Sequence, residues 1–231
     1  MSTHADIMII SPHADDAEFG AAGSVALWTQ SGKKVLYVIC TNGDKGTTDR
    51  SVDPQQLIKQ RKQEQKNAAD LLGVTDVIFL GFPDQGLEDN DDFRKKIVRR
   101  IREFRPHTIV TTDPYRKYLW HRDHRITGQV VLDAVYPYAR DHLSYPDLIE
   151  EGLEPHKVRE VLFWAAEDIN YRINISDTFE QKISALYCHE SQMNEMTGFN
   201  PKEWCRQNCE KIANKEPYEL AEGFHRIVLP G

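Results

Sequence analysis

The sequence lacks the features that mark membrane and secreted proteins. No apolar run is long enough to cross a bilayer, and the first residues contain neither the basic region nor the long apolar region of a signal peptide. The four cysteines form no CxxC pair and are too loosely spaced for a disulfide framework or a cysteine-based metal site. We therefore expect no membrane span and a cytoplasmic location.

The sequence is also poor in patterns that bind nucleic acids or nucleotides. The formal net charge is −7, and the basic residues between positions 94 and 102 alternate with apolar ones at helical spacing, which is typical of a solvated helix face. The glycines at positions 20 and 23 are too few and misplaced for a dinucleotide fingerprint, and no Gly-rich phosphate loop occurs. These absences argue against a nucleic-acid partner.

The composition that remains is that of an ordinary globular protein. Hydrophobic residues make up 40% and charged residues 28% of the 231 residues, which fits one large domain. No internal repeat, low-complexity tract or Pro/Gly-rich linker divides the chain. We expect a single domain over residues 1–231, with a motif-bearing core at 1–137 and a C-terminal elaboration at 138–231.

Strand-like and helix-like segments alternate along the first part of the chain. The expected strands are residues 7–11, 34–41, 77–80 and 108–112, and the expected helices are residues 23–31, 54–72, 91–104 and 125–135. After residue 137 we expect strands at 158–166 and 173–175 and helices at 177–187 and 201–212. This alternation predicts an α/β fold, a three-layer sandwich with a mostly parallel sheet covered on both faces.

Polar clusters follow the four expected strands of the first part. After each strand in turn come His13, Asp15 and Asp16; Asn42 and Asp44; Asp84; and the segment His121-Arg122-Asp123-His124. Open parallel sheets bind ligands at the carboxyl ends of their strands. We therefore expect four loops that are distant in sequence to converge on one functional rim.

The clusters contain the donor groups of a catalytic zinc site. His13, Asp16 and His124 would give two imidazoles and one carboxylate, with one position left open for water. Neighbouring side chains point in different directions, so we assign Asp16 to the metal and Asp15 to the water, from which it would remove a proton. Fe²⁺ can occupy similar sets of nitrogen and oxygen ligands.

A further histidine could serve as the acid. His121 and His124 are three residues apart and share a face if a helix begins there. One can bind the metal while the other, His121, hydrogen-bonds the developing oxyanion and then protonates the departing amine. Asp123 could hold the His121 imidazole in its orientation.

Simpler interpretations of the same residues exist. Adjacent aspartates between a strand and a helix are often caps, and either Asp15 or Asp16 alone could be one. The segment His-Arg-Asp also opens a kinase catalytic loop, but no Asn follows at the required place. The remaining histidines are interpreted as structural, and His189 stands out among them because Cys188 and Glu190 flank it. These histidines are His4, His107, His142, His156, His189 and His225.

Two motifs together resemble a known family. Residues 12–20, Pro-His-Ala-Asp-Asp-Ala-Glu-Phe-Gly, and the segment from His121 to His124 resemble the LmbE-like, or PIG-L, zinc deacetylases. Those enzymes remove the acetyl group from N-acetylglucosamine units, often in glycolipid or low-molecular-weight thiol pathways. The resemblance covers residues 5–135 and implies a Rossmann-like fold, with the metal ligands, base and acid at the positions assigned above.

The same resemblance implies contacts to the sugar. Arg61, in the pattern Arg61-x-x-Glu64, and Asp84 are implied as sugar-binding residues, together with Asn42 and Asp44. These are residue types that also form ordinary salt bridges and turns.

The chain departs from the family pattern near the first motif. Many members have Pro at the position of Ala14 and Glu at that of Ala17, whereas the acid here is Glu18. This arrangement looks like that of the bacillithiol-pathway deacetylases, which act on a glucosaminyl malate. The bulky residues 118–120, Tyr-Leu-Trp, precede His121 and are expected to form a bulky entrance, which is compatible with a different substrate.

We therefore predict a zinc-dependent amidohydrolase that removes an acetyl group from a small N-acetylglucosamine-type sugar, or its conjugate, through metal-activated water. Two alternatives stay open. One is a metal-dependent hydrolase of another bond, such as a phosphoester, and the other is a non-enzymatic sugar-binding protein that retains the metal. The sequence is compatible with a homo-oligomer and does not give the oligomeric state.

Overall fold

The apolar segments of the chain pair into one sheet. In the computed structural model, which describes residues 4–118, 121–196 and 198–230, seven strands lie in the order β3-β2-β1-β4-β5-β7-β6. The strands are β1 (Ile7–Ser11), β2 (Val35–Thr41), β3 (Asp76–Phe82), β4 (Thr108–Thr112), β5 (Glu160–Trp164), β6 (Tyr171–Asn174) and β7 (Ala221–Val228). Strands β1 to β5 pair in parallel, and β7 is antiparallel to both β5 and β6. The predicted α/β fold with a mostly parallel sheet is confirmed.

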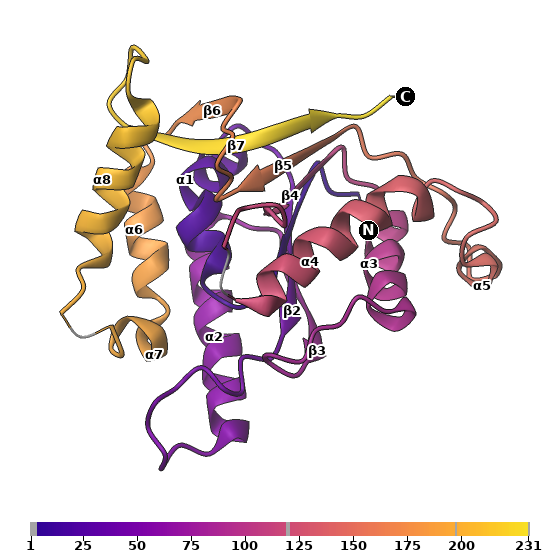
Figure 1. The fold of residues 1–231 in the computed structure, drawn as a ribbon, viewed down its shortest axis with the longest axis horizontal. Coiled ribbons are helices and arrows are strands. Elements are labelled where there is room, and N and C mark those ends of the chain that lie inside the picture. The colour runs from indigo at the N-terminus through magenta and orange to yellow at the C-terminus, as the bar shows by residue number, and fades with distance from the viewer. Residues whose placement is uncertain (1–3, 119–120, 197, 231) are drawn as a thin grey trace.

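Helices cover both faces of this sheet. They are α1 (Asp16–Gln30), α2 (Pro54–Leu72), α3 (Asp91–Phe104), α4 (Arg122–Asp133), α5 (Pro146–Glu150), α6 (Phe179–Tyr187), α7 (Glu190–Met193) and α8 (Pro201–Ala213), with a kinked π-helical turn, η1 (Ala134–Tyr138), after α4. In Figure 1, α1, α2, α6 and α8 lie on one side of the sheet, and α3, α4 and α5 lie on the other. The arrangement is the predicted three-layer sandwich.

The central strands are buried along their whole length because both of their faces are covered. Every residue of β1, β2 and β4 is buried. Successive side chains point to opposite faces of a sheet, so Ile7 and Ile9 belong to the core beneath α1, whereas Met8 and Ile10 belong to the core beneath α3 and α4. A buried parallel sheet of this kind leaves the loops at the strand ends as the places for polar chemistry.

Helix α2 begins and ends where the sequence predicts. The Asp53 side chain accepts a hydrogen bond from the Gln55 amide, and Pro54 occupies the first helical turn. Gly73 follows the last residue with φ of 74°, the left-handed conformation that glycine adopts without steric cost. These local signals fix both ends of the helix.

Helix α1 begins at Asp16 rather than at residue 23, so the predicted start is wrong. The glycines that suggested a later start lie inside the helix because neighbouring side chains press against it. A Cβ atom at Gly20 would lie 2.5 Å from the Trp164 indole, and one at Gly23 would lie 2.8 Å from Ile175. Helix α4 also begins earlier than predicted, at Arg122.

Three further elements were not predicted from the sequence. Helices α5 and α7 are each a single turn or little more. Strand β7 carries polar residues that obscure its pattern, and its first four residues are nevertheless buried between β5 and β6. The predicted edge strand at 173–175 is present as β6, and it does lie at an edge of the sheet.

The residues after position 137 extend the same sheet. They contribute β5, β6 and β7, which pair with one another and with β4. This pairing supports a single domain over residues 1–231, which stays a prediction. Among the helices of the described residues, none has the length and apolarity needed to cross a membrane.

Candidate active site

The loops after β1, β2, β3 and β4 meet at the carboxyl ends of these strands, as the strand pattern predicts. His13 and Asp15 follow β1, and Asp84 follows β3. His121 occupies the N-cap position of α4. Leu119 and Trp120 lie outside the described residues, and Tyr118 is 90% exposed.

The three predicted metal ligands lie in contact. One oxygen of the Asp16 carboxylate is 3.0 Å from Nδ1 of His13, and the other is 3.2 Å from Nε2 of His124. The backbone amide of His13 also donates to Asp16, at 3.0 Å. Asp16 therefore lies between the two imidazoles that the sequence pairs with it.

Electrostatics favours the ionised form of Asp16. Burial alone would raise the pKa of this carboxyl, but the imidazoles of His124 and His13 outweigh burial and hold the pKa well below its ordinary value. An ionised carboxylate with two imidazoles is the donor chemistry that suits Zn²⁺. The side chains present therefore fit the ion that the sequence predicts.

Other possible metal-binding side chains surround His13. Nitrogen atoms of His13, His121 and His124 lie within 4.8 Å of one another, and His13 also forms such a group with Asp84, His121 and Asp123. The ring centroids of His13 and His121 are 4.5 Å apart. Neither of these two groups includes Asp16, so the assignment of individual ligands stays a prediction.

Asp15 lies in a strained and buried position beside the three predicted ligands. Its φ is 89°, which is rare for a residue with a side chain. Asp15 is the N-cap residue of α1, yet its side chain makes no capping hydrogen bond, which argues against the simpler interpretation as a cap. Burial raises the pKa of the Asp15 carboxyl to about 6, although the Arg61 guanidinium lowers it.

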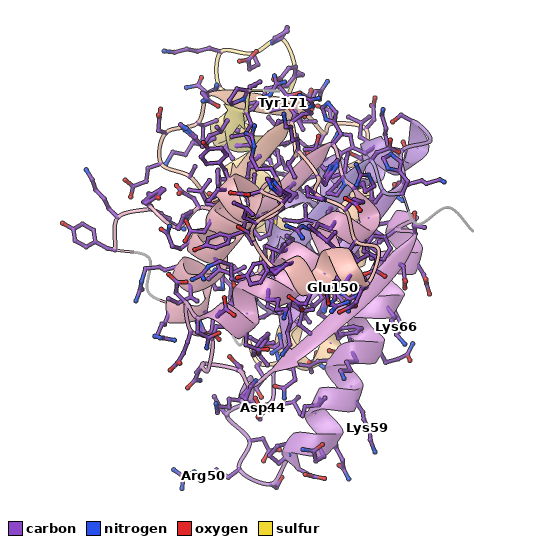
Figure 2. All side chains as sticks on the ribbon, turned by 90° about the vertical axis from the view of Figure 1, so that its right-hand side faces the viewer. Asp44, Arg50, Lys59, Lys66, Glu150 and Tyr171 are labelled. Carbon is purple, nitrogen blue, oxygen red and sulfur yellow. The ribbon has the colours of Figure 1, made fainter. Side chains whose placement is uncertain are left out.

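Arg61 supports this loop from helix α2. Its Nη2 donates to the carbonyl of Ala14 at 2.8 Å and lies 3.5 Å from the Asp15 carboxylate. Arg61 is buried, whereas Lys59 and Lys66 project outward from the same helix (Figure 2). The observed bonds of Arg61 thus hold the loop, and its predicted contact with a sugar stays a prediction.

Asp84 and Asn42 occupy neighbouring loops. The Asp84 carboxylate lies 3.1 Å from Nε2 of His13. The backbone amide of Asp84 donates to the Asp44 carboxylate. Asn42 accepts from the Asp44 amide within its own turn. Figure 2 shows Asp44 at the end of the molecule that also carries the loop with Arg50. The structure brings Asp84 to the site directly and links Asn42 to it through Asp44.

The Asp123 carboxylate lies among the amides of the loop after β3 and the His13 ring. The Asp123 carboxylate accepts hydrogen bonds from the backbone amides of Gln85 and Leu87 and lies 3.3 Å from Nε2 of His13. The backbone amide of Asp123 donates to Nδ1 of His121, at 3.2 Å. The loop after β3 and His13 thus engage the Asp123 carboxylate, and its role in orienting the His121 imidazole stays a prediction.

The hydrogen bond from the Asp123 amide determines which ring nitrogen of His121 carries the proton. A ring nitrogen that accepts a hydrogen bond carries no proton, so the proton of a neutral His121 ring lies on Nε2. Burial lowers the pKa of His121, and the nearby His13 and His124 lower it further. The His121 ring is therefore a neutral hydrogen-bond donor at its Nε2 atom.

Comparison with known proteins decides the family. A sequence profile described as "PIG-L: GlcNAc-PI de-N-acetylase" matches residues 8–135, more than half of the 231-residue chain. The chain belongs to the PIG-L family. The family predicted from residues 12–20 and 121–124 is confirmed.

Curated PIG-L relatives are deacetylases of acetylated sugars. The diacetylchitobiose deacetylase of Thermococcus kodakarensis is 38% identical to this chain over 189 residues, covering 82% of this chain and 70% of that protein. The "probable N-acetyl-alpha-D-glucosaminyl L-malate deacetylase 2" of Bacillus cereus is 30% identical over 195 residues, covering 82% and 84% of the two chains. The prediction of an amidohydrolase of this family is confirmed.

A solved structure of a PIG-L-type deacetylase has the same fold. The N,N′-diacetylchitobiose deacetylase of Pyrococcus horikoshii superposes with a TM-score of 0.92 at 27% identity, covering 97% of this chain and 84% of that one. The agreement extends over the C-terminal part of the chain, beyond the residues that the family profile matches.

Behind the PIG-L motif lies a buried polar network that sequence reasoning missed. Glu18 accepts a hydrogen bond from Gln65 at 3.0 Å and lies 3.2 Å from Nε2 of His189, while Gln65 accepts from the Asp15 amide. Ser191 bonds through its amide and hydroxyl to Glu64 of α2. The departure at Glu18 and the flanked His189 were the available signals, but only the fold shows that they meet.

A second buried pair of charged side chains binds backbone groups of α1. Lys182 of α6 donates to the carbonyls of Glu18 and Phe19, and Glu222 of β7 accepts from the amides of Gly23 and Ser24. The Lys182 and Glu222 side chains are 2.7 Å apart and almost fully buried. Side chains of α6 and β7 thus bind backbone groups of the helix that begins with Asp16.

Proposed function

We propose that this chain is a zinc-dependent deacetylase that releases acetate from N-acetylglucosamine-type sugars. The observation that carries the proposal is the contact of Asp16 with His13 and His124 beside the buried Asp15, at the carboxyl ends of parallel strands. Membership of the PIG-L family and the deacetylase activity of the curated relatives support the substrate type.

Each residue then has a defined task. His13, Asp16 and His124 would hold the metal. When bound, Zn²⁺ supplies Lewis-acid chemistry, which lowers the pKa of water and polarises a carbonyl. The Asp15 carboxylate removes a proton from the attacking water. Arg61 and Gln65 hold the loop that carries it.

The later steps follow from the neutral state of His121. Its Nε2–H donates a hydrogen bond to the oxyanion that develops on the amide carbonyl. A neutral imidazole is a weak acid, so the proton that Asp15 has taken is the better source for the departing amine. We therefore propose Asp15 as both base and acid, and His121 as the oxyanion donor rather than the amine's acid.

The test combines metal analysis with acetate release. The purified chain is expected to contain about one zinc ion and to release acetate from N-acetylglucosamine or its conjugates. Asp15→Asn should retain the metal and lose about a thousandfold in kcat.

Three results would contradict the proposal. They are a chain that binds no metal on reconstitution, an Asp15→Asn variant with full activity, and turnover of phosphoesters in place of acetylated sugars. Metal analysis of protein prepared without oxygen would distinguish zinc from Fe²⁺.

A further inference from the structure

The peptide unit between Ala14 and Asp15 is held at both of its polar groups. Its carbonyl oxygen, on Ala14, accepts a hydrogen bond from Nη2 of Arg61 at 2.8 Å, and its N–H, on Asp15, donates to Oε1 of Gln65 at 3.3 Å. Arg61 and Gln65 are four residues apart, so they lie on one face of α2. The carbonyl of Asp15 accepts from two amides in the first turn of α1. The backbone on both sides of the Asp15 Cα atom is therefore fixed, and with it the direction of the carboxylate.

The side-chain amide of Gln65 can bind the Asp15 amide in only one of its two orientations. Its oxygen must face the Asp15 N–H, because an NH2 group in that place would set one donor against another. The Nε2 atom of Gln65 donates to Oε1 of Glu18 at 3.0 Å. An ionised carboxylate accepts hydrogen bonds and donates none. Glu18 thus selects the orientation in which Gln65 accepts from Asp15.

His189 in turn holds Glu18. The second oxygen of the Glu18 carboxylate lies 3.2 Å from Nε2 of His189, and both side chains are fully buried. Within the part of the chain that the structure describes, the other ring nitrogen, Nδ1, has no hydrogen-bond partner. Burial of an imidazole whose second nitrogen is unpaired costs stability. An apolar side chain would suit this position better if packing were its only task.

This contact joins a distant part of the chain to the first motif. His189 comes 171 residues after Glu18, outside residues 8–135 that the family profile matches. It lies between α6 and α7, and both helices pack against α2 (Figure 1). The same segment is also attached to α2 by Ser191, whose amide and hydroxyl donate to Glu64. Because the bonds of Ser191 do not involve Gln65, they offer a matched control.

We propose that His189 is a positioning residue for the Asp15 carboxylate and acts through Glu18 and Gln65. The inference rests on the proposed function, in which Asp15 removes a proton from water. Loss of the contact at His189 frees Glu18 and then Gln65 to turn, which leaves the Asp15 N–H without an acceptor and lets its strained backbone relax. The carboxylate then lies away from the attacking water, which slows the reaction without weakening sugar binding.

Substitution of His189 tests this chain of contacts in the zinc-loaded protein, with N-acetylglucosamine and N,N′-diacetylchitobiose as probes. His189→Leu should lower kcat for acetate release about 10- to 100-fold, with KM within about twofold and the bound zinc unchanged. His189→Gln should restore most of the activity, because its side-chain amide can donate to Glu18. Gln65→Met carries the same prediction as His189→Leu and decides the matter if His189→Leu does not fold. Ser191→Ala is the control and should have the wild-type kcat.

Hydrogen exchange at the Asp15 amide reports positioning whether or not turnover occurs. This amide should exchange at least about tenfold faster in His189→Leu than in the wild type and equally fast in Ser191→Ala, as NMR spectroscopy of isotope-labelled protein measures. Acceleration at Asp15 in a protein that releases no acetate would count against the proposed function alone.

Three results would overturn the inference. The first is a folded His189→Leu protein with the wild-type kcat. The second is a loss of kcat with unchanged exchange at Asp15, since His189 would then act elsewhere. The third is equal acceleration at amides throughout the protein, because a general loss of stability would then be the cause.

Discussion

Asp15 combines a strained backbone with a carboxylate that no helix amide binds. A positive φ costs a residue with a side chain about 1–3 kcal/mol, and such strain persists where the surrounding structure enforces it. At this position, Arg61 at the Ala14 carbonyl and Gln65 at the Asp15 amide enforce it. These contacts therefore hold the carboxylate at the rim, and the strain that they impose lowers stability.

Two variants that both lack the carboxylate separate strain from chemistry. The free energy of unfolding of Asp15→Gly should be about 1 kcal/mol higher than that of Asp15→Ala, after allowance for the greater freedom of glycine in the unfolded chain. Both should be inactive. Urea denaturation measures the difference, and equal stability of the two variants would show that the backbone at Asp15 is unstrained.

His189 makes the stability of the fold depend on pH. Burial would lower the pKa of His189, but the hydrogen bond and charge of Glu18 outweigh burial and raise it above its ordinary value of 6.5. A group with a raised folded-state pKa stabilises the fold below its unfolded pKa, and this contribution is lost as pH rises through the folded pKa. The stabilisation by His189 is thus greatest in mild acid.

The comparison of wild type with His189→Asn checks this sign. The wild type should exceed the variant in free energy of unfolding by more at about pH 5.5 than at about pH 8.5. The measurement uses metal-free protein, so that metal affinity does not contribute. A difference that grows with pH would contradict the ion pair with Glu18.

At the scale of elements, helix α1 depends on side chains from β7 and α6. Lys182→Met would leave the Glu222 carboxylate buried without its cation, which typically costs about 3–5 kcal/mol. Because Glu222 also binds two amides of α1, the double variant Lys182→Met/Glu222→Gln should lose less than the sum of the two single changes. Denaturation of the four proteins measures the coupling, and additive losses would show that the pair does not act as a unit.

The elements that could be predicted are those with local signals at their ends. Helix α2 has Asp53, Pro54 and Gly73, and its bounds are correct in the structure. Helix α1 could not be placed, because the glycines that suggest a break are explained only by Trp164, far away in sequence. Strand β7 was missed for a similar reason, since Glu222 is buried only because Lys182 meets it.

The candidate site shows the same division. His13, Asp16 and His124 were predicted because adjacent loops of a parallel sheet must converge. For Asp123, the spacing of residues in the sequence does not reveal that the amides of Gln85 and Leu87 engage its carboxylate. The spacing of residues in the sequence predicts which side chains come together, and only the tertiary structure shows which of their atoms form hydrogen bonds.

At the scale of the whole molecule, a bound metal would join segments that are far apart in the chain. The predicted ligands come from the loop after β1, the start of α1 and helix α4. An ion that binds only the folded chain stabilises it by about 2.7 kcal/mol when the free ion is at 100 times its Kd.

Removal of the metal should therefore lower the midpoint of thermal unfolding. Calorimetry before and after chelation measures the shift, and added zinc should reverse it. Asp16→Asn serves as the control, because its unfolding should respond little to chelation. A wild-type midpoint that is insensitive to both chelator and zinc would contradict a metal site at His13, Asp16 and His124.

The hydrogen bonds that the amides of Gly23 and Ser24 donate to Glu222 also have a consequence for biosynthesis. A chain still emerging from the ribosome has made α1 long before it makes β7, and until then those two amides lack their carboxylate and Lys182 lacks its partner. The part of α1 around Gly23 and Ser24 therefore reaches its final form only after β7 has been synthesised.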